Sequence, residues 1–489
     1  MKPTLHTGLC ALAIVAGVSA CDNFAIKNPN GVDLSSLTQS PNRAKLAAAA
    51  TGIFQSSRYD ITSYIWRTGS MGREGANLSG NNQPDYQEPF IGPLSSGGSF
   101  GSEDWFNEYT AVRNANNYID AVPKATDLSA AEQAASLGFA QTIKALEFMY
   151  IISLRADLGA PVDVDRPPTV APAPWVSEDG VYADIIAMLD SARVSLTAAG
   201  ATAFPFSLPP GYATYGFNTP ATFLQFNAAL LAKANVLRAT DQVTGAAPST
   251  ACGGNPTSCF NAALAALDSS FITLAADNFK TGVYFDYSTA AGDQQNDLSE
   301  PLNGPIYFSL FYADTVDSAN AEKQPGGAFD QRILNKIVPA ADTQVLAGFP
   351  LIGNNKFIVF FVGGLPSPGA SIPIIRDEEL ILLRAEAELG TGANTLAQSD
   401  IDFVRVNSGN LAPLPGPLSS AALLTELLYN RQYSLLWEQG TRWIDARRYN
   451  LLANIPLAVS GGAVPSRMPI PTDECEARGL GSQCDPLGT

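Results

Sequence analysis

The tract from residue 430 to 450, NRQYSLLWEQGTRWIDARRYN, constrains the fold of this 489-residue chain more than any other segment. Leucines before and within the tract recur at helical spacing and predict one apolar stripe on a helix. Gly440 predicts a hinge, and a second short helix is expected after it. The tract therefore predicts two helices joined by a tight bend. The leucines of the stripe are Leu424, Leu427, Leu428, Leu435 and Leu436.

Charged side chains on this tract are expected to form a structural ion network. Arg431 falls on the apolar stripe, so its charge needs a partner, and Glu438 is the expected one. Asp445 is spaced to bridge Arg442 and Arg448 along one side of the second helix. A catalytic interpretation would require a nucleophile and a cleft, which the tract does not indicate. We therefore interpret these five residues as a lattice that locks the two helices together.

The N-terminal residues 1–20 have the form of a signal peptide, with Lys2 followed by an apolar run over residues 9–18. That run is too short to span a membrane, which takes about 20 apolar residues. Small residues precede Cys21 directly, as in a bacterial lipobox, so we expect Cys21 to be lipidated and residues 21–40 to form a tether. A lipid anchor on the membrane is favoured over plain secretion.

Four further cysteines form two close pairs, and each pair brackets a glycine-containing loop. Short disulfides are expected in an oxidising compartment. Metal binding is the rival interpretation, but the spacings lack the C-x-x-C form of zinc knuckles. The expected disulfides are Cys252 with Cys259 and Cys475 with Cys484.

Composition excludes several classes of function. The only histidine is His6, inside the expected signal peptide, so the mature chain lacks histidine-based catalysis and imidazole metal sites. A net charge of −17 without a basic cluster argues against nucleic acid binding. The 46 Asp and Glu residues leave carboxylate-dependent chemistry possible. We expect no metal and no cofactor.

Helical periodicity predicts a mainly α fold with long loops and a few short strands, organised as a single large domain. Residues 59–100 and about 278–370 are rich in Gly, Asn and Pro and are expected to be loops, the second set with a few strands. The domain is expected over residues 41–489, with a helical scaffold over about 41–275 and 376–455 and a loop-rich, ligand-facing insertion over about 278–370. The expected helices cover residues 41–58, 103–121, 129–158, 177–196, 219–238 and 376–389.

Residues 430–450, together with RMPIPTDE at residues 467–474, resemble the C-terminal signature of SusD/RagB-like outer-membrane nutrient-binding lipoproteins. Tyr433 and Ser434 depart from the family pattern at its first acidic position. Further segments resemble other family elements in the expected order along the chain. The matching residues are Arg431, Glu438, Gly440, Arg442, Trp443, Asp445, Arg448, Pro469, Ile470, Pro471 and Glu474.

The resemblance implies a tetratricopeptide-like scaffold of helical pairs and a non-enzymatic binding protein. It also implies a lipid-anchored position on the outside of the outer membrane, over a SusC-like TonB-dependent transporter. The implied cargo is an oligosaccharide, and some members of the family take peptides instead. An acidic chain suits neutral or cationic cargo better than an anionic polysaccharide.

Sugar capture needs flat aromatic faces together with amides and carboxylates. The candidate ligand residues are Trp66, Asn81, Asn82 and Tyr86, because they share one polar segment rich in glycine and asparagine. A wider set of candidates consists of the tyrosines Tyr284, Tyr287, Tyr307 and Tyr312.

Two other functions remain open. One is an exported, all-helical glycosidase that uses paired carboxylates, and hydrolysis of oligosaccharides would identify it. The other is an assembly lipoprotein built on helical repeats, which would bind a barrel-assembly partner rather than a transporter.

Overall fold

The computed structural model describes residues 34–167, 169–240, 251–304, 309–346 and 348–487. The expected signal peptide and Cys21 lie outside these residues. Helix α2 (Leu34–Gln39) falls within the expected tether, yet it belongs to the helical domain, because Leu37 is buried in the core. The domain therefore includes residues before the expected boundary at 41.

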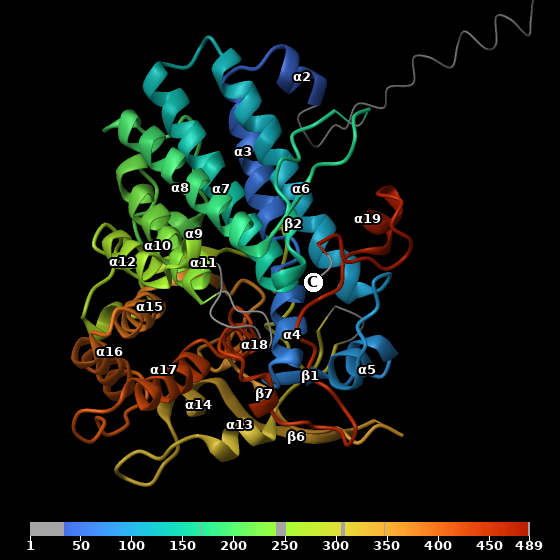
Figure 1. Cartoon of the computed structure of the whole chain (residues 1–489), viewed down its shortest axis with the longest axis vertical. Helices are drawn as coiled ribbons and strands as arrows, with labels where there is room; N and C mark the ends of the chain where they lie inside the picture. The colour runs from blue at the N-terminus through green and yellow to red at the C-terminus, as the bar shows by residue number, and fades with distance from the viewer. Residues whose placement is uncertain (1–33, 168, 241–250, 305–308, 347, 488–489) are drawn as a thin grey trace, which may run out of the picture.

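The main helices form a continuous stack in which each helix packs on the next (Figure 1). The stack runs α3, α6, α7, α8, α10, α12 and α15, and α15 then contacts both α16 and α17. This arrangement confirms the expected mainly α fold of helical pairs. The bounds are α3 (Arg43–Arg58), α6 (Ser99–Ala121), α7 (Ala130–Arg155), α8 (Glu178–Ala199), α10 (Pro220–Ala239), α12 (Pro256–Leu267), α15 (Asp377–Gly390), α16 (Asn394–Asn407) and α17 (Ser420–Ser434).

Helix α7 is the central element of the stack. Ser129 and Glu132 form a capping box at its start, which satisfies two backbone N–H groups. A β-carbon on Gly138 would lie 2.5 Å from Cγ of Leu196, so glycine is what lets α8 approach this closely. The segment Ala130–Leu158 is long and apolar enough to cross a membrane, but 83% of its most apolar window is buried inside the protein. This segment is therefore a core helix of the domain.

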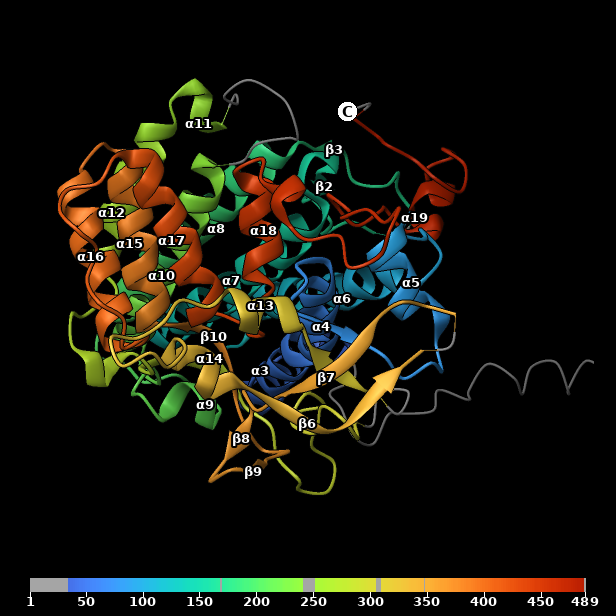
Figure 2. The ribbon, with the colours of Figure 1, turned by 90° about the horizontal axis from the view of Figure 1, so that it is seen from below.

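The largest sheet lies at the end of the stack that is lowest in Figure 1, where β1, β6 and β7 are labelled (also Figure 2), whereas β2 lies beside α6. Four antiparallel strands form a sheet in the order β1-β5-β7-β6, and β10 pairs antiparallel with β4. Most of them lie in the segment expected to contain loops and short strands. The bounds are β1 (Gly75–Asn77), β2 (Ala160–Pro161), β3 (Trp175–Val176), β4 (Gly282–Phe285), β5 (Phe311–Ala313), β6 (Ile337–Val345), β7 (Ile352–Phe357), β8 (Phe361–Val362), β9 (Leu365–Pro366) and β10 (Ile372–Arg376).

The expectation of long loops over residues 59–100 is wrong. Helix α4 (Ile61–Met71), strand β1 and helix α5 (Gln83–Ile91) occupy much of this segment. Every residue of α4 is buried, but the helix is only 11 residues long and contains Gly69, which is a poor helix former and favoured the loop expectation. The remaining short helices are α9 (Pro210–Ala213), α11 (Ala251–Gly254), α13 (Thr315–Asn320), α14 (Gln331–Lys336), α18 (Thr441–Arg448) and α19 (Thr472–Ala477).

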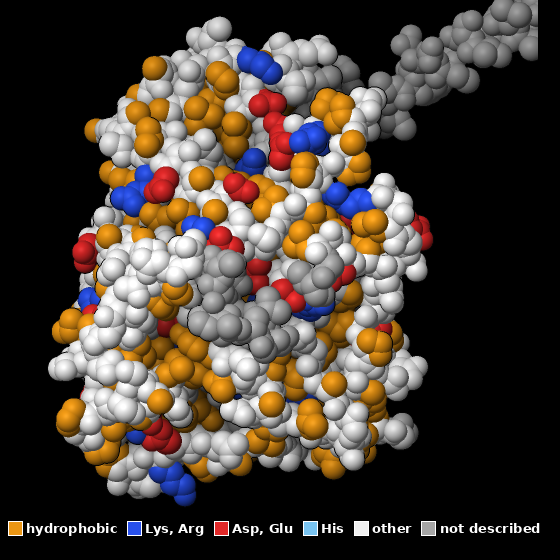
Figure 3. All heavy atoms as spheres, viewed as in Figure 1, with side chains coloured by type: hydrophobic (Ala, Val, Ile, Leu, Met, Phe, Trp, Pro, Cys, Tyr) orange, Lys and Arg blue, Asp and Glu red, His pale blue; other side chains and the backbone are white. Residues whose placement is uncertain are grey.

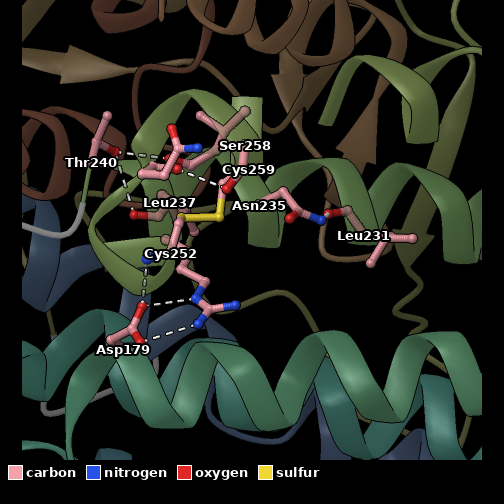
Figure 4. Close-up of a disulfide and its surroundings, with 11 residues drawn as sticks. Asp179, Leu231, Asn235, Leu237, Thr240, Cys252, Ser258 and Cys259 are labelled. Carbon is pink, nitrogen blue, oxygen red and sulfur yellow. Dashed lines mark hydrogen bonds and ion pairs between the residues drawn. A yellow bond between two sulfur atoms is a disulfide. The ribbon is translucent and has the colours of Figure 1, made fainter. Parts of the chain in front are cut away.

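Both expected disulfides are present, Cys252–Cys259 and Cys475–Cys484. The first lies beside α8, where the carboxylate of Asp179 accepts hydrogen bonds from the backbone N–H of Cys252 and from the guanidinium of Arg238 (Figure 4). This cluster links α8, α10 and α11, and the disulfide joins α11 to α12.

The helix, hinge and helix of residues 430–450 are present as α17, Gly440 and α18. Gly440 is left-handed, with φ of 65°, and a β-carbon there would lie 2.1 Å from Oγ1 of Thr68. Glycine is required at this bend for both reasons.

The ion network exists, but its pairs differ from the expected ones. Helix α17 ends at Ser434, so Glu438 lies beyond it and turns away from Arg431. Glu438 pairs instead with Lys336 at 2.8 Å and with Arg376 at 2.9 Å. The expected pair Arg431–Glu438 is therefore wrong.

Asp445 bridges Arg431 at 2.7 Å and Arg448 at 2.6 Å, and Arg448 also binds Glu386 of α15 at 2.6 Å. Arg442 was expected to share the bridge to Asp445, and this expectation is wrong. Its guanidinium donates instead to the backbone carbonyl of Arg73. The buried network thus joins α15, α17 and α18.

Candidate functional site

A surface groove lies between the end of α3, the start of α4 and the segment of residues 284–297, and we call it the α3–α4 groove. Its larger compartment has a volume of about 820 Å³. A second compartment of about 420 Å³ shares four wall residues with the first, so the two compartments adjoin and we describe them together as the groove. The shared residues are Gln55, Arg58, Gly292 and Asp293.

Arg58 fixes the far wall of the groove to α3. Its guanidinium donates to the carbonyl of Asp286 and forms an ion pair with Asp293. The hydroxyl of Ser288 donates to Asp293 at 2.6 Å, and the Gln294 side chain donates to the carbonyl of Tyr59 at 3.0 Å. The wall is therefore positioned before any ligand arrives, which reduces the ordering cost of binding.

Aromatic side chains line both compartments. The Tyr59 ring is 63% exposed in the larger one. Phe54, Tyr212 and Tyr284 line the smaller one, where Tyr284 stacks on Tyr215 with ring centroids 5.6 Å apart. Phe54 and Tyr212 are buried, so Tyr59 and Tyr284 are the rings that can pack on the C–H surface of a sugar or on an apolar side chain.

Carboxylates outnumber cations in the groove. Burial raises the pKa of Asp297, and a hydrogen bond from Thr62 partly offsets that rise. Burial and the nearby Asp104 raise the pKa of Asp60, against the effect of the Arg67 guanidinium. The acidic residues of the two compartments are Asp60, Glu103, Asp286, Asp293 and Asp297, and the basic ones are Arg58 and Arg67. This lining suits hydroxyl and ammonium donors better than anionic groups.

The prediction that Trp66 contacts the ligand is wrong. The side chain is only 1% exposed, and its ring packs against Phe100 and Phe311 with centroids 6.0 and 5.8 Å away. Its placement in a polar loop was wrong, because it lies in the fully buried helix α4. It is a core residue.

The structure brings the other three candidates together at the start of α5, outside the α3–α4 groove. Asn81 is exposed, Asn82 donates to the carboxylate of Asp85 at 2.8 Å, and the half-buried Tyr86 ring lies 5.3 Å from Phe349. Of the wider set of tyrosines, Tyr284 lines the groove, Tyr287 and Tyr312 are buried, and Tyr307 lies outside the described residues.

Sequence reasoning missed Arg58, Tyr59, Asp293 and Asp297. One available signal was the polar run GDQQND at residues 292–297, which is typical of an exposed loop with hydrogen-bonding side chains. The other was the tyrosine directly after the first long helix, where an apolar residue in a polar context often marks a binding surface.

On the face of the molecule seen in Figure 3, Lys and Arg side chains are scattered among acidic ones and form no continuous basic patch. The face also carries separate apolar patches over several helices.

No protein-family model matches the sequence, and no curated protein matches it either. Solved structures do match over nearly the whole chain. A SusD superfamily protein from Bacteroides vulgatus is 15% identical, with a TM-score of 0.62, over 90% of this chain and 98% of that one. A SusD-like protein from Bacteroides fragilis is 12% identical, with a TM-score of 0.65, over 94% of this chain and 99% of that one.

A SusD-like carbohydrate binding protein from Bacteroides fragilis is 13% identical, with a TM-score of 0.62, over 86% of this chain and 88% of that one. At these identities the likeness concerns the fold. The SusD-like fold that was predicted from the resemblance of residues 430–474 is thus confirmed over nearly the whole chain.

Proposed function

We propose that this chain, which has the fold of SusD-superfamily proteins, is an outer-membrane surface lipoprotein that binds oligosaccharides. It passes them to a SusC-like TonB-dependent transporter. The fold and the lipobox-like sequence before Cys21 support the class of protein. The observation that carries the binding role is the α3–α4 groove, with its positioned polar wall and the exposed ring of Tyr59.

The groove favours neutral or amino sugars over sulfated or uronate-rich glycans. Its carboxylates accept hydrogen bonds from hydroxyl and ammonium groups, whereas Arg58 is already engaged by Asp293 and Arg67 by Asp104. An anionic glycan would meet repulsion without a compensating pair.

Binding of the purified mature protein to arrays of glycans and peptides tests this proposal. We expect retention of neutral or amino oligosaccharides of several units. Exclusive retention of peptides would instead establish the peptide-binding alternative, and selective retention of sulfated glycans would contradict the cargo class.

The same glycans, incubated with the protein and analysed for shorter products, test the absence of enzymatic activity. The groove contains carboxylates, so a glycosidase is the competing function. We expect no hydrolysis. Turnover that is abolished by Asp297→Asn or Glu103→Gln would show an enzyme and overturn the binding role.

The membrane and transporter partners need a separate test in cells of the native host. A Cys21→Ala variant should be released from the membrane fraction, and the wild type should co-purify with a TonB-dependent barrel. Co-purification with a barrel-assembly machine instead would favour the assembly lipoprotein.

A further inference from the structure

We infer that Asp60, Asp104 and Glu108 form a binding site for one divalent cation of the calcium type beneath the α3–α4 groove. One carboxylate oxygen from each residue lies within 4.8 Å of the others. Oxygens on opposite sides of a calcium ion are about 4.6–5.2 Å apart, because each bond is about 2.3–2.6 Å long. Three oxygens within 4.8 Å of one another can therefore all reach one ion.

One oxygen of each carboxylate in this cluster lacks a hydrogen-bond donor, although the Arg67 guanidinium lies 3.6 Å from the Asp60 oxygen. Oδ2 of Asp60, Oδ2 of Asp104 and Oε2 of Glu108 are buried atoms with no hydrogen-bond partner. Asp104 is fully buried and Glu108 is 4% exposed. Burying a charged oxygen without a hydrogen-bond donor is costly, so the arrangement calls for a ligand.

The balance of charged side chains around the cluster also indicates a bound cation. Arg67 contacts Asp104 at 2.7 Å and Asp60 at 3.6 Å, and it also pairs with Glu103. Arg155 lies near Asp104 and Glu108. Two guanidinium groups therefore meet four carboxylates, those of Asp60, Glu103, Asp104 and Glu108, and one divalent cation would balance the excess charge.

Two features favour calcium and provide a route to the site. The ligands are all carboxylates, which hard cations such as calcium prefer. Asp60 and Glu103 also line the larger compartment of the groove, so an ion can enter from it.

The ion would join two elements of the groove. Asp60 flanks the start of α4, and Asp104 and Glu108 are one turn apart on α6. Asp104 has non-helical backbone angles (φ −71°, ψ 18°) inside α6, which sets it apart from the regular helix around it. Cation binding would therefore hold α4 against α6 and stabilise the groove floor.

Calcium binding to the mature protein tests this site without any glycan. After treatment with EDTA and its removal, we expect one Ca²⁺ per chain in a calorimetric titration and a saturable rise in Tm. Tb³⁺ emission should show the same single site and be displaced by Ca²⁺. Absence of saturable binding to the wild type would overturn the site.

Glu108→Gln is the decisive variant, since it removes a charge but keeps the shape. We expect its Ca²⁺ affinity to fall at least tenfold and the calcium-dependent rise in Tm to disappear. Asp190→Asn, at an exposed position on α8, is the matched control and should bind as the wild type does.

If Glu108→Gln does not fold, Asp60→Asn gives the same test, because its side chain opens toward the groove. Unchanged affinity in the folded variant would overturn the site. A Tm that rises on acidification and does not respond to Ca²⁺ would show that protons neutralise the cluster instead, and would also overturn it.

Discussion

A β-carbon on Gly69 would lie 2.6 Å from Cζ3 of Trp437, because the buried tryptophan ring rests against the backbone of α4. The same ring stacks on Phe357 with centroids 4.0 Å apart. The backbone N–H of Trp437 donates to the carboxylate of Glu74 at 2.9 Å. The C-terminal tract is thereby joined to α4, which begins beside the groove.

Substituting Gly69→Ala should therefore lower the free energy of unfolding by about 1–3 kcal/mol, since the methyl group forces the Trp437 ring to move. Gly52→Ala is a matched control, because Gly52 lies in α3 with open space around its α-carbon. This control should gain about 0.5–1 kcal/mol from helix propensity. Urea denaturation measures both, and equal stability of the two variants would contradict the packing described.

Asp445→Ala should lower the free energy of unfolding by about 3–5 kcal/mol, because it leaves Arg431 and Arg448 without their shared buried partner. Asp163→Ala removes an exposed ion pair with Arg166 and should change stability by less than about 1 kcal/mol. The affinity of the folded Asp445→Ala protein for its ligand should stay close to the wild-type value. A large loss of affinity with an unchanged unfolding midpoint would contradict a structural role.

The carboxyl group of Glu147 predicts a pH dependence of stability. Burial raises its pKa to about 8, although the Ser57 hydroxyl donates a hydrogen bond to it. The folded chain therefore keeps a proton that the unfolded chain releases near a pKa of about 4.3. Its contribution to stability is complete below that pH and is lost as the pH rises toward about 8.

Glu147→Gln should flatten this dependence. The difference in unfolding free energy between wild type and variant should change by up to about 1.4 kcal/mol per pH unit between about pH 4.5 and 8. Glu74 and other buried acids remain in both proteins, so the difference isolates Glu147. Parallel stability curves for the two proteins would show that Glu147 is ionised in the folded state.

The stack of helices could be predicted from the sequence because its members carry clear start signals and apolar stripes. Ser129 with Glu132 and Thr219 with Thr222 form capping boxes at the starts of α7 and α10. Helix α4 has no side-chain cap at its start and contains Gly69, and the residues after it are rich in Gly and Asn, so the segment was interpreted as a loop.

The ion network shows a different limit of prediction from sequence. Arg431, Asp445 and Arg448 were identified from their spacing, but the pairs depend on where α17 ends and on Glu386, which lies on another helix. The groove depends still more on distant segments, since Tyr59 and Asp293 meet only through the tertiary fold. Spacing along one segment carries no information about such contacts.

The central claim is that the α3–α4 groove binds the cargo, and calorimetric affinity of a retained oligosaccharide for Tyr59→Ala tests it most directly. Phe106→Ala is the matched control, because Phe106 is an exposed aromatic residue outside this groove. We predict at least a tenfold loss of affinity for Tyr59→Ala, about 1.4 kcal/mol, and no change for Phe106→Ala. Wild-type affinity in Tyr59→Ala, with a loss in Phe106→Ala, would contradict the account.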